Sequence, residues 1–510
     1  MTGGQFYLGI DLGTTTSVAA YADSAGHPSS LTNFEGDVLT PSAVFFDQQR
    51  LMVGREAIKA ATSDPERFVE CFKRHMGEPA YQKPIDGRTY RPEFLSAVVL
   101  RRLKRDIHSQ LGDVSRAVVT VPAYFDASRR RATQNAARIA GWEVADIINE
   151  PTAAALAYAH RTEQLQHRTG ERQRILVYDL GGGTFDTTIL SVCSGREYRT
   201  LATEGEVRLG GCDWDQRLCE HLAEEFRKKT GGDPLTTARG RATFLRTARQ
   251  VKHTLSSRKL AAVPCSWQGR RALLSVTRDT FESLTRNLLE RTRDTTQIVL
   301  EEAGLGWNQL DRILLVGGAS RMPMVARMLH SLTGKKPDQS VSADEAVAHG
   351  AAIYCWLQAM DSSVRVVNVA SHTLRIVVRK HDVERLAIRM IDKNSELPSR
   401  RTVMIPVSRP GQRSIRVEVC EGENRDPNLC ERLGVVRING LPADGTKRWK
   451  VALDIQCQKD GLVGVTASVR DPDQLSHVVK EVSAVLEPSR SLNQRQLQQA
   501  RRLLDSFEIA

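Results

Sequence analysis

The chain has 510 residues, of which 41% are hydrophobic and 26% are charged. Both fractions are ordinary for a globular protein, and they exclude a largely disordered chain, a collagen-like chain and a coiled-coil rod. At about 150 residues per domain, the length predicts roughly three domains.

Lysine and arginine exceed aspartate and glutamate by 12 residues. The basic stretches are short and carry no interleaved aromatic residues, so nucleic-acid binding is disfavoured. No window is apolar enough to span a membrane, and the N-terminus does not resemble a secretory signal. The nine cysteines form no CxxC pair, which argues against a structural zinc site or a disulfide framework and favours a reducing, cytoplasmic location.

From residue 6 to about 360, short β-branched runs alternate with longer helical patterns, which predicts an α/β architecture. The predicted strands are FYLGI (6–10), AVVTV (117–121), ILVYD (175–179) and ILLVG (313–317). The predicted helices cover 93–111, 127–141, 214–229, 238–256, 278–303 and 344–360. The polar stretch 161–174 is predicted to be an exposed loop.

After about residue 361 the pattern changes to short alternating runs separated by turn signals such as LPADG and KDG. This texture predicts an antiparallel β-sandwich of ~110 residues. The final stretch, 491–507, spaces Leu492, Leu497, Leu503 and Leu504 at roughly helical intervals, with Ser491 as a candidate cap.

Two segments, GIDLGTTTS (9–17) and YDLGGGTFD (178–186), repeat one pattern of strand, Asp-Leu-Gly, small residues and Thr. Glycines let backbone amides approach phosphate oxygens, and threonine hydroxyls add donors. Asp11 and Asp179, at the strand ends, can hold a hydrated Mg²⁺. One such turn alone is often an ordinary hairpin, but two facing turns would clamp a polyphosphate from both sides.

A third glycine motif is LLVGGASRMPMV (314–325). In it an apolar strand is followed by Gly317 and Gly318, and then by a Ser and an Arg that open a helix. Such a turn permits close approach of a nucleotide's base and sugar, and Arg321 could stack its planar guanidinium on adenine.

These three segments resemble the signature segments of the heat shock protein 70 (DnaK-type) chaperones. The stretch 117–158 resembles that family almost continuously, and so do RLGGCDWDQRL (208–218) and SADEAVAHGAAI (342–353). The resemblance covers about 6–360 and continues more weakly through 369–486. It implies an α/β actin-like ATPase of two duplicated lobes and four subdomains, then an all-β sandwich and a short C-terminal helix.

The implied domains are an ATPase domain at 1–360, a linker at 361–368, a substrate-binding sandwich at 369–486 and a truncated helical lid at 487–510. The implied activity is slow, Mg²⁺-dependent ATP hydrolysis that controls the binding of polypeptide segments. ATP or ADP and Mg²⁺ would be the cofactors, with K⁺ as an optional further ion. Clients would be unfolded or specific polypeptides, helped by a J-domain co-chaperone and a nucleotide exchange factor, and the chain is expected to be monomeric.

The resemblance also implies roles for individual residues. The phosphate-binding residues would be Gly13, Thr14, Thr15, Gly181, Gly182, Gly183 and Thr184. Asp11 and Asp179 would hold Mg²⁺ through waters, while Lys73 would position the attacking water with Glu150, Thr184 and Asp186 around it. The nucleoside would contact Arg249, Lys252, His253, Ser256, Gly317, Gly318, Arg321 and Asp344. Pro122 and Arg130 match the family's interdomain switch pair.

Each of these roles has a simpler alternative. Lys73 could be a solvated helix lysine, and Glu150 could merely end a strand before Pro151. Arg130 lies in a run of three arginines that could form a solvated helix face. The alanine stripe at 153–159 is expected to be a tightly packed helix core.

Several features depart from the family. In ARQVKHTLSS (248–257), Arg249 stands where the family has an acid that accepts from the ribose hydroxyls, and His253 stands where it has an arginine. A buried ribose hydroxyl without its acceptor would cost ~1–3 kcal/mol. This predicts weakened nucleotide binding, and predicts that Arg249→Glu tightens it.

The linker carries Arg365 between Val364 and Val366, and a charge there is expected to oppose docking. The expected peptide-gripping loop, 377–387, is charged and lacks glycines. These departures leave open an alternative to a general chaperone, namely an ATP-switched scaffold dedicated to one protein partner. An actin-like filament former and a sugar kinase are less consistent with the appended β domain and with the motifs.

Overall fold

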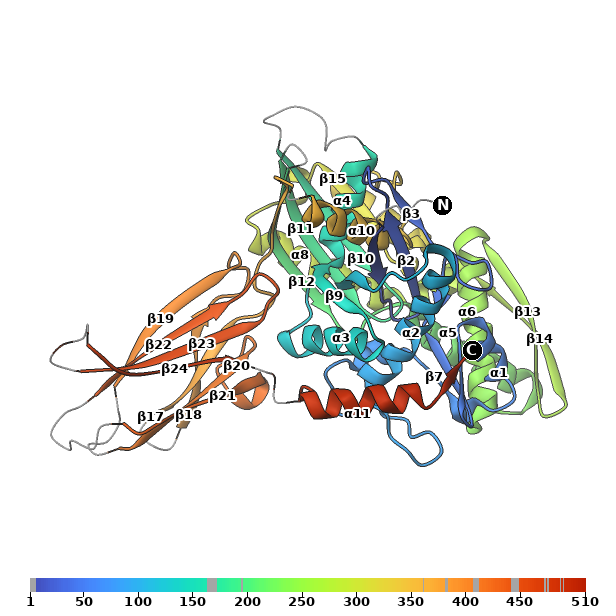
Figure 1. The fold of residues 1–510 in the computed structure, drawn as a ribbon. Coiled ribbons are helices and arrows are strands. Elements are labelled where there is room, and N and C mark those ends of the chain that lie inside the picture. Colours follow the sequence, from blue (N-terminus) through green and yellow to red (C-terminus); the bar gives the residue numbers. More distant parts are fainter. Residues whose placement is uncertain are drawn as a thin grey trace. The chain divides into compact units, whose positions relative to one another are not determined.

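The computed structural model describes residues 6–162, 172–193, 196–360, 362–380, 384–406, 412–441, 449–471, 474, 477–486, 488 and 490–510 (Figure 1). Most of the expected loop at 161–174 therefore lies outside the described residues. The chain divides into two compact units. Unit 1 is Met1–Ala123, Thr133–Val366 and Leu492–Ala510, and unit 2 is Tyr124–Ala132 and Val367–Ser491.

Two sheets form the centre of unit 1, and each is built around one of the repeated hairpins. The first has the order β3-β2-β1-β8-β9, with β4 beside β2. Its strands are β1 (Tyr7–Asp11), β2 (Thr16–Ala22), β3 (Pro28–Ser30), β4 (Thr40–Pro41), β8 (Arg116–Val121) and β9 (Glu143–Asn149). The second has the order β15-β10-β11-β12-β16. Its strands are β10 (Arg172–Leu180), β11 (Phe185–Cys193), β12 (Glu197–Glu206), β15 (Arg312–Val316) and β16 (Arg365–Val367).

The two sheets share a pairing pattern that matches the sequence repeat. β1 pairs antiparallel with β2 and parallel with β8, and β10 pairs antiparallel with β11 and parallel with β15. In these registers Asp11 lies opposite Val18, while Asp179 lies opposite Asp186. The duplicated α/β lobes predicted from the two motifs are therefore present.

The helices of unit 1 are α1 (Arg55–Ala60), α2 (Pro92–Leu111), α3 (Ala127–Ile139), α4 (Glu150–Arg161), α5 (Gly211–Thr230), α6 (Ala238–Ser257), α7 (Arg278–Leu284), α8 (Arg286–Glu302), α9 (Pro323–Thr333) and α10 (Ala346–Ala359), with the first residues of α3 grouped in unit 2. Buried residues of α4 and α10 share one hydrophobic core with strands of both central sheets. The alanine stripe of α4 is completely enclosed there, as its composition predicts.

The predicted helix at 278–303 is two helices, because the chain leaves helical geometry at Thr285, where φ is −116°. The Thr285 hydroxyl is buried and donates to the Phe281 carbonyl at 2.8 Å, which closes α7. A periodic pattern continues through this break and therefore could not reveal it.

Unit 1 also contains strands that the sequence did not predict. β13 (Leu260–Trp267) and β14 (Arg270–Thr277) form a hairpin. A four-stranded sheet has the order β25-β6-β5-β7. Its strands are β5 (Ala43–Asp47), β6 (Arg50–Val53), β7 (Phe68–Glu70) and β25 (Glu508–Ile509). Strands β5, β6, β7 and β25 are two to five residues long, too short for their alternation to stand out.

The C-terminal segment belongs to unit 1. Helix α11 (Gln494–Asp505) is capped by Asn493, which accepts from the Gln496 amide at 2.9 Å, so the expected Ser491 cap is wrong. Leu504 is buried, and β25 adds in parallel to β6. The segment expected to be a truncated lid therefore packs within unit 1.

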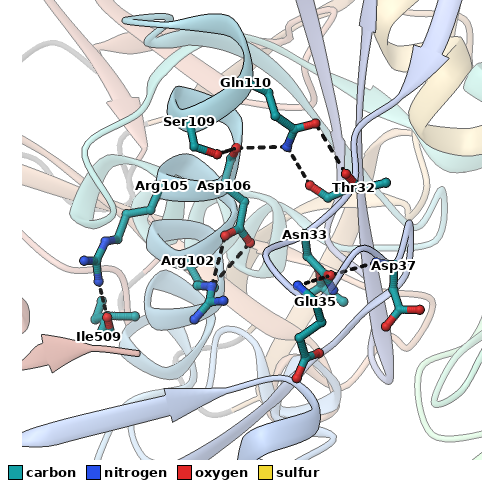
Figure 2. Close-up of polar contacts among 11 residues, drawn as sticks. Thr32, Asn33, Glu35, Asp37, Arg102, Arg105, Asp106, Ser109, Gln110 and Ile509 are labelled. Atoms are coloured by element: carbon teal, nitrogen blue, oxygen red, sulfur yellow. Dashed lines mark hydrogen bonds and ion pairs between the residues drawn. The ribbon is translucent and has the colours of Figure 1, made fainter.

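Helix α2 contacts part of this C-terminal segment. Arg101 pairs with Asp505 at 2.9 Å, and the Arg105 guanidinium donates to the main-chain carbonyl of Ile509. Figure 2 shows Arg105 reaching toward Ile509, while Gln110 on the same helix donates to the Thr32 carbonyl at 2.6 Å. α2 thus links the C-terminal strand with the loop that follows β3.

Unit 2 is a β-sandwich of two four-stranded antiparallel sheets with the orders β18-β17-β20-β21 and β19-β22-β23-β24. Their strands are β17 (Leu374–Lys380), β18 (Glu384–Ile391), β19 (Ser399–Pro406), β20 (Ser414–Glu421), β21 (Glu431–Asn439), β22 (Lys450–Cys457), β23 (Val463–Arg470) and β24 (Val478–Leu486). Residues from both sheets form one core, as the alternating runs predict. The expected grip loop belongs to the β17–β18 hairpin, and its residues 381–383 lie outside the described part.

Among the described helices, none has the length and apolar character required to cross a membrane.

Candidate functional site

The turns of the two repeated hairpins meet in unit 1. A Cβ added to Gly182 would lie 2.3 Å from the Thr15 hydroxyl oxygen, and one added to Gly183 would lie 2.4 Å from Cγ2 of Thr14. Real Cβ atoms do not approach so closely, so only glycine allows this contact. The structure therefore brings together the two turns that the repeat predicted to face each other.

The carboxylates at the strand ends are buried beside these turns. Asp11 accepts from the Thr120 hydroxyl at 2.9 Å. Burial, followed by the charge of Glu150, raises the pKa of Asp11 to about 7. Burial, followed by Glu150 and Asp186, also raises the pKa of Asp179 well above its ordinary value. A bound cation would offset the repulsion that raises both values.

Lys73 lies at the centre of these carboxylates. It is part of the short helix η2 (Phe72–His75), is only 2% exposed and pairs with Glu150 at 2.7 Å. Burial lowers the pKa of the Lys73 amine, but Glu150 and Asp11 raise it by more, and the net pKa is above its ordinary value. Lys73 is thus a fixed cation and not a solvated helix lysine.

Glu150 reaches this position because it is the first residue of α4. Its neighbour Pro151 suits the first turn of a helix, where no amide partner is needed, and Glu150 itself is buried. A carboxylate at a helix N-terminus is also stabilised by the helix dipole. Glu150 is therefore the first residue of a helix, directly after the last residue of β9.

The N-terminus of α5 holds the second hairpin in place. The amide of Gly211 donates to the Gly181 carbonyl at 3.0 Å, and that of Cys212 donates to the Gly182 carbonyl at 2.7 Å. Asp213 accepts from the Gly210 amide at 2.8 Å and from Arg74 at 3.1 Å. The motif RLGGCDWDQRL carries these residues, but its sequence did not reveal their contacts with the hairpin.

The third glycine motif packs against the end of β10. Gly317 has a φ of 79°, and a Cβ there would lie 2.5 Å from the Leu180 carbonyl oxygen and 2.7 Å from the Asp179 carboxylate. Arg321 donates twice to one Asp344 oxygen, at 3.0 and 2.6 Å. A Cβ on Gly318 would lie 3.4 Å from Asp344. The expected nucleoside residues Gly317, Gly318, Arg321 and Asp344 therefore lie together next to Asp179.

The expected nucleoside helix is α6, and two of its basic residues, Arg249 and Lys252, have acidic partners. Arg249 donates to both oxygens of Glu70 at 3.1 Å and to Asp215 at 3.3 Å. Lys252 pairs with Asp215 at 2.7 Å and donates to the Gly211 carbonyl at 3.0 Å. Glu70 and Asp215 were missed because they come from β7 and α5, far from α6 in the sequence.

These contacts change the expectation for Arg249. The replaced acid does not leave a lone donor, because Arg249 is held by two carboxylates. A glutamate at this position would face Glu70 and Asp215, so like-charge repulsion would oppose the tightening of nucleotide binding expected from Arg249→Glu.

The two other expected nucleoside-binding residues, His253 and Ser256, also lie on α6. Burial, followed by Lys252, lowers the pKa of His253, which leaves its ring neutral near pH 7. The Ser256 hydroxyl donates to the Lys252 carbonyl one turn earlier, at 3.2 Å.

The two expected switch residues belong to different units. Pro122 is buried after β8 in unit 1, whereas Arg130 is grouped with unit 2. Arg130 is 8% exposed and donates to the Phe125 carbonyl at 2.9 Å, so it does not form a solvated helix face. In the same unit, Glu421 accepts from the Ala127 amide at 3.0 Å.

The linker joins the second central sheet as the edge strand β16. The Arg365 amide donates to the Arg196 carbonyl at 2.7 Å. The Arg365 side chain is exposed, while Val364 and Val366 pack against the core of unit 1. The expectation that this charge opposes docking is wrong, because strand alternation turns Arg365 to solvent and its two valine neighbours inward.

Comparisons with known proteins agree with this architecture. The family model described as "Hsp70 protein" matches residues 7–86 and 78–503. The chain is 38% identical over 468 residues to "Chaperone protein DnaK" of Halobacterium salinarum, covering 90% of this chain and 72% of that relative. It is also 38% identical over 479 residues to "Chaperone protein DnaK" of Thermotoga neapolitana, covering 91% of this chain and 78% of that protein. On these matches and on its duplicated α/β lobes followed by a β-sandwich, the chain belongs to the Hsp70 family.

Proposed function

We propose that this Hsp70-type, ATP-dependent chaperone binds and hydrolyses ATP where its two hairpin turns meet. The observation that carries the proposal is the buried Lys73–Glu150 pair, at 2.7 Å, next to Asp11 and Asp179. Three carboxylates, Asp11, Glu150 and Asp179, act on the charge of Lys73, and Asp186 acts on that of Asp179. This excess of buried carboxyl groups over cations fits a bound divalent cation, which would favour their ionised form.

The turns supply the phosphate-binding groups. Their glycines expose backbone amides, and Thr14, Thr15 and Thr184 add hydroxyl donors. Because the phosphoryl transition state is loose, catalysis depends on fixed donors and positive charge more than on covalent chemistry. The close packing of Gly182 and Gly183 on the opposite turn supplies such rigidity.

Asp11 and Asp179 would hold Mg²⁺, which would neutralise phosphate charge when bound. No group of three His, Cys, Asp or Glu side chains in the described part of the chain could hold a metal directly, and Mg²⁺ commonly binds through one or two carboxylates and waters. Lys73 would then orient the attacking water and stabilise charge on the γ-phosphate. Glu150 fixes the Lys73 amine, and Asp186 lies opposite Asp179 to complete the polar surroundings.

The base and sugar would lie between α6 and the Gly317–Arg321 turn. Arg321 and Asp344 support the adenine side, while His253 offers a neutral ring for stacking. Because Glu70 and Asp215 bind Arg249, the ribose would meet a basic residue whose charge is already balanced.

Titration of the purified chain with ATP tests the site. Calorimetry should show one ATP per chain, with clearly tighter binding in the presence of Mg²⁺, and phosphate release should be slow. The absence of ATP binding by the folded protein would contradict the proposal. K⁺ dependence can be measured in the same experiment by exchange for Na⁺.

Unit 2 would bind client polypeptides, and β16 would connect its state to the nucleotide. The packing of Val364 and Val366 on unit 1 supports this coupling. A J-domain co-chaperone and a nucleotide exchange factor would set the pace of the cycle, with the chain acting as a cytoplasmic monomer. ATP should speed the release of a bound peptide, and Val366→Asp should weaken that effect.

A further inference from the structure

Two cysteines lie in contact beside the proposed phosphate site. The Sγ atoms of Cys71 and Cys212 are 2.8 Å apart, although the residues are separated by 141 positions in the sequence. Cys71 connects β7 with η2, and Cys212 lies in the first turn of α5. Both are half-buried free thiols. The thiol contact therefore joins the segment that carries Lys73 to the helix that supports the second hairpin.

The surrounding contacts hold both thiols in this position. Glu70, which precedes Cys71, receives two hydrogen bonds at 3.1 Å from Arg249 of α6. Arg74 of η2 pairs at 3.1 Å with Asp213, which follows Cys212. One ion pair thus joins β7 to α6, and the other joins η2 to α5. Forming a bond here requires little further ordering of the chain.

The backbone at Cys71 supports the same conclusion. Its φ of 57° and ψ of 18° lie in the left-handed region, which residues other than glycine seldom adopt. Such a conformation is energetically unfavourable and persists where surrounding contacts determine it. Its effect here is to present the Cys71 thiol to Cys212.

We propose that Cys71 and Cys212 form a reversible disulfide that joins η2 to α5 and retains the bound nucleotide. The second part rests on the proposed nucleotide site. Lys73 lies two residues after Cys71, and the Cys212 amide binds the Gly182 carbonyl of the phosphate turn at 2.7 Å. A covalent bond between these two sides would restrain the separation that nucleotide exit requires.

The oxidant is a small disulfide such as oxidised glutathione. One cysteine thiolate attacks it, forms a mixed disulfide and displaces one glutathione thiolate. The other cysteine then attacks the protein sulfur of that mixed disulfide and displaces the second glutathione. Overall, two protein thiols become one S–S bond and oxidised glutathione becomes two thiols. A dithiol reductant reverses both exchanges.

The exchange should be slow near neutral pH. The hydrogen bond with Cys212, followed by burial, raises the pKa of the Cys71 thiol well above its ordinary value. Little thiolate is then present to attack, so oxidation should be followed over hours.

Peptide mapping under non-reducing conditions tests the bond. After oxidation of the full chain, a linked peptide containing Cys71 and Cys212 should appear, lighter by two hydrogen atoms and lost on reduction. The linked peptide should persist in the control Cys193→Ser and vanish in Cys71→Ser and in Cys212→Ser. If the oxidised wild-type protein contains no such peptide, the proposal is wrong.

Release of a fluorescent ATP analogue tests the effect on nucleotide. The analogue is bound first, the protein is oxidised, and excess ATP is added. Oxidised wild-type protein and oxidised Cys193→Ser should release the analogue at least about tenfold more slowly than the same proteins when reduced. Reduction should restore the faster release. If the disulfide-linked protein released the analogue as fast as the reduced protein does, nucleotide retention would be overturned.

If the reduced protein binds no nucleotide, the proposed function fails and nucleotide retention fails with it. The bond itself is still decided by the peptide map. The two experiments therefore distinguish a failure of the disulfide from a failure of the nucleotide site.

Discussion

The two ends of the proposed site differ in how their charges are paired. At the phosphate end one cation, Lys73, lies among several buried carboxylates. At the nucleoside end Arg249 and Lys252 share Asp215, and Arg249 also binds Glu70. The phosphate end therefore has more buried carboxyl groups than cations, while the nucleoside end is balanced by its own ion pairs. We infer that the first region depends on a bound cation and ligand, and that the second holds its structure without them.

The largest effect should come from Lys73→Ala at the phosphate end. Single-turnover ATP hydrolysis should fall by about 10²–10³-fold, because a fixed charge at the transferred phosphate is lost. The exposed residue Lys59 on α1 offers the matched control Lys59→Ala, which should hydrolyse ATP normally.

Lys73→Ala also leaves Glu150 buried without its partner, which can destabilise a protein by about 3–5 kcal/mol. The double variant Lys73→Ala with Glu150→Gln removes that charge. Normal hydrolysis by either folded variant would remove Lys73 from the mechanism.

Two glycine variants compare the phosphate end of the proposed site with its nucleoside end. Gly182→Ala places a Cβ 2.3 Å from Thr15, so ATP binding should weaken by about 1–3 kcal/mol through overpacking. Gly318→Ala places one at 3.4 Å from Asp344 and should change binding by less than about 0.5 kcal/mol. Calorimetry on both proteins measures the difference, and the reverse order of effects would contradict the packing described for the turns.

A charge exchange tests the nucleoside end. Arg249→Glu should lower the free energy of unfolding by about 0.5–3 kcal/mol, because the new carboxylate faces Glu70 and Asp215. Adding Glu70→Arg should recover part of that loss in a denaturant titration. If Arg249→Glu alone were neutral or tightened ATP binding, the ion pairs at this end would be unimportant.

The smallest effect should be that of His253→Phe. Burial and Lys252 lower the pKa of His253, so the ring is already uncharged near pH 7. Protonation of His253 would occur only as the pH falls further, so its contribution to ATP affinity should be constant between about pH 7 and 8. We expect Phe to change the affinity by less than about 0.5 kcal/mol, whereas a larger loss would assign a polar role to the imidazole.

Much of the site could be predicted because it lies in local motifs. The Asp-Leu-Gly turns combine a strand, glycines and a carboxylate within nine residues, and both the duplication and the position of Asp11 and Asp179 followed from them. The Gly317–Arg321 turn was recognisable for the same reason. The family assignment rested on these segments and is confirmed.

The pairings between distant segments could not be predicted. Glu70 and Asp215 carry no signal of their own, yet their ion pairs with Arg249 oppose the effect expected of Arg249→Glu. Arg365 appeared to oppose linker docking until strand pairing placed it on the solvent side. The Leu periodicity at the C-terminus predicted a helix but not that α11 and β25 pack within unit 1.

The amino-acid sequence by itself determined the order of α/β repeats and β-sandwich, the glycine turns and the identity of the charged residues, since backbone preference and alternation act over a few positions. Only the tertiary structure decided which charges neutralise one another, how the linker docks and which thiols touch. These properties depend on distances between segments that the sequence separates by tens to hundreds of residues, and burial then sets the strength of each contact.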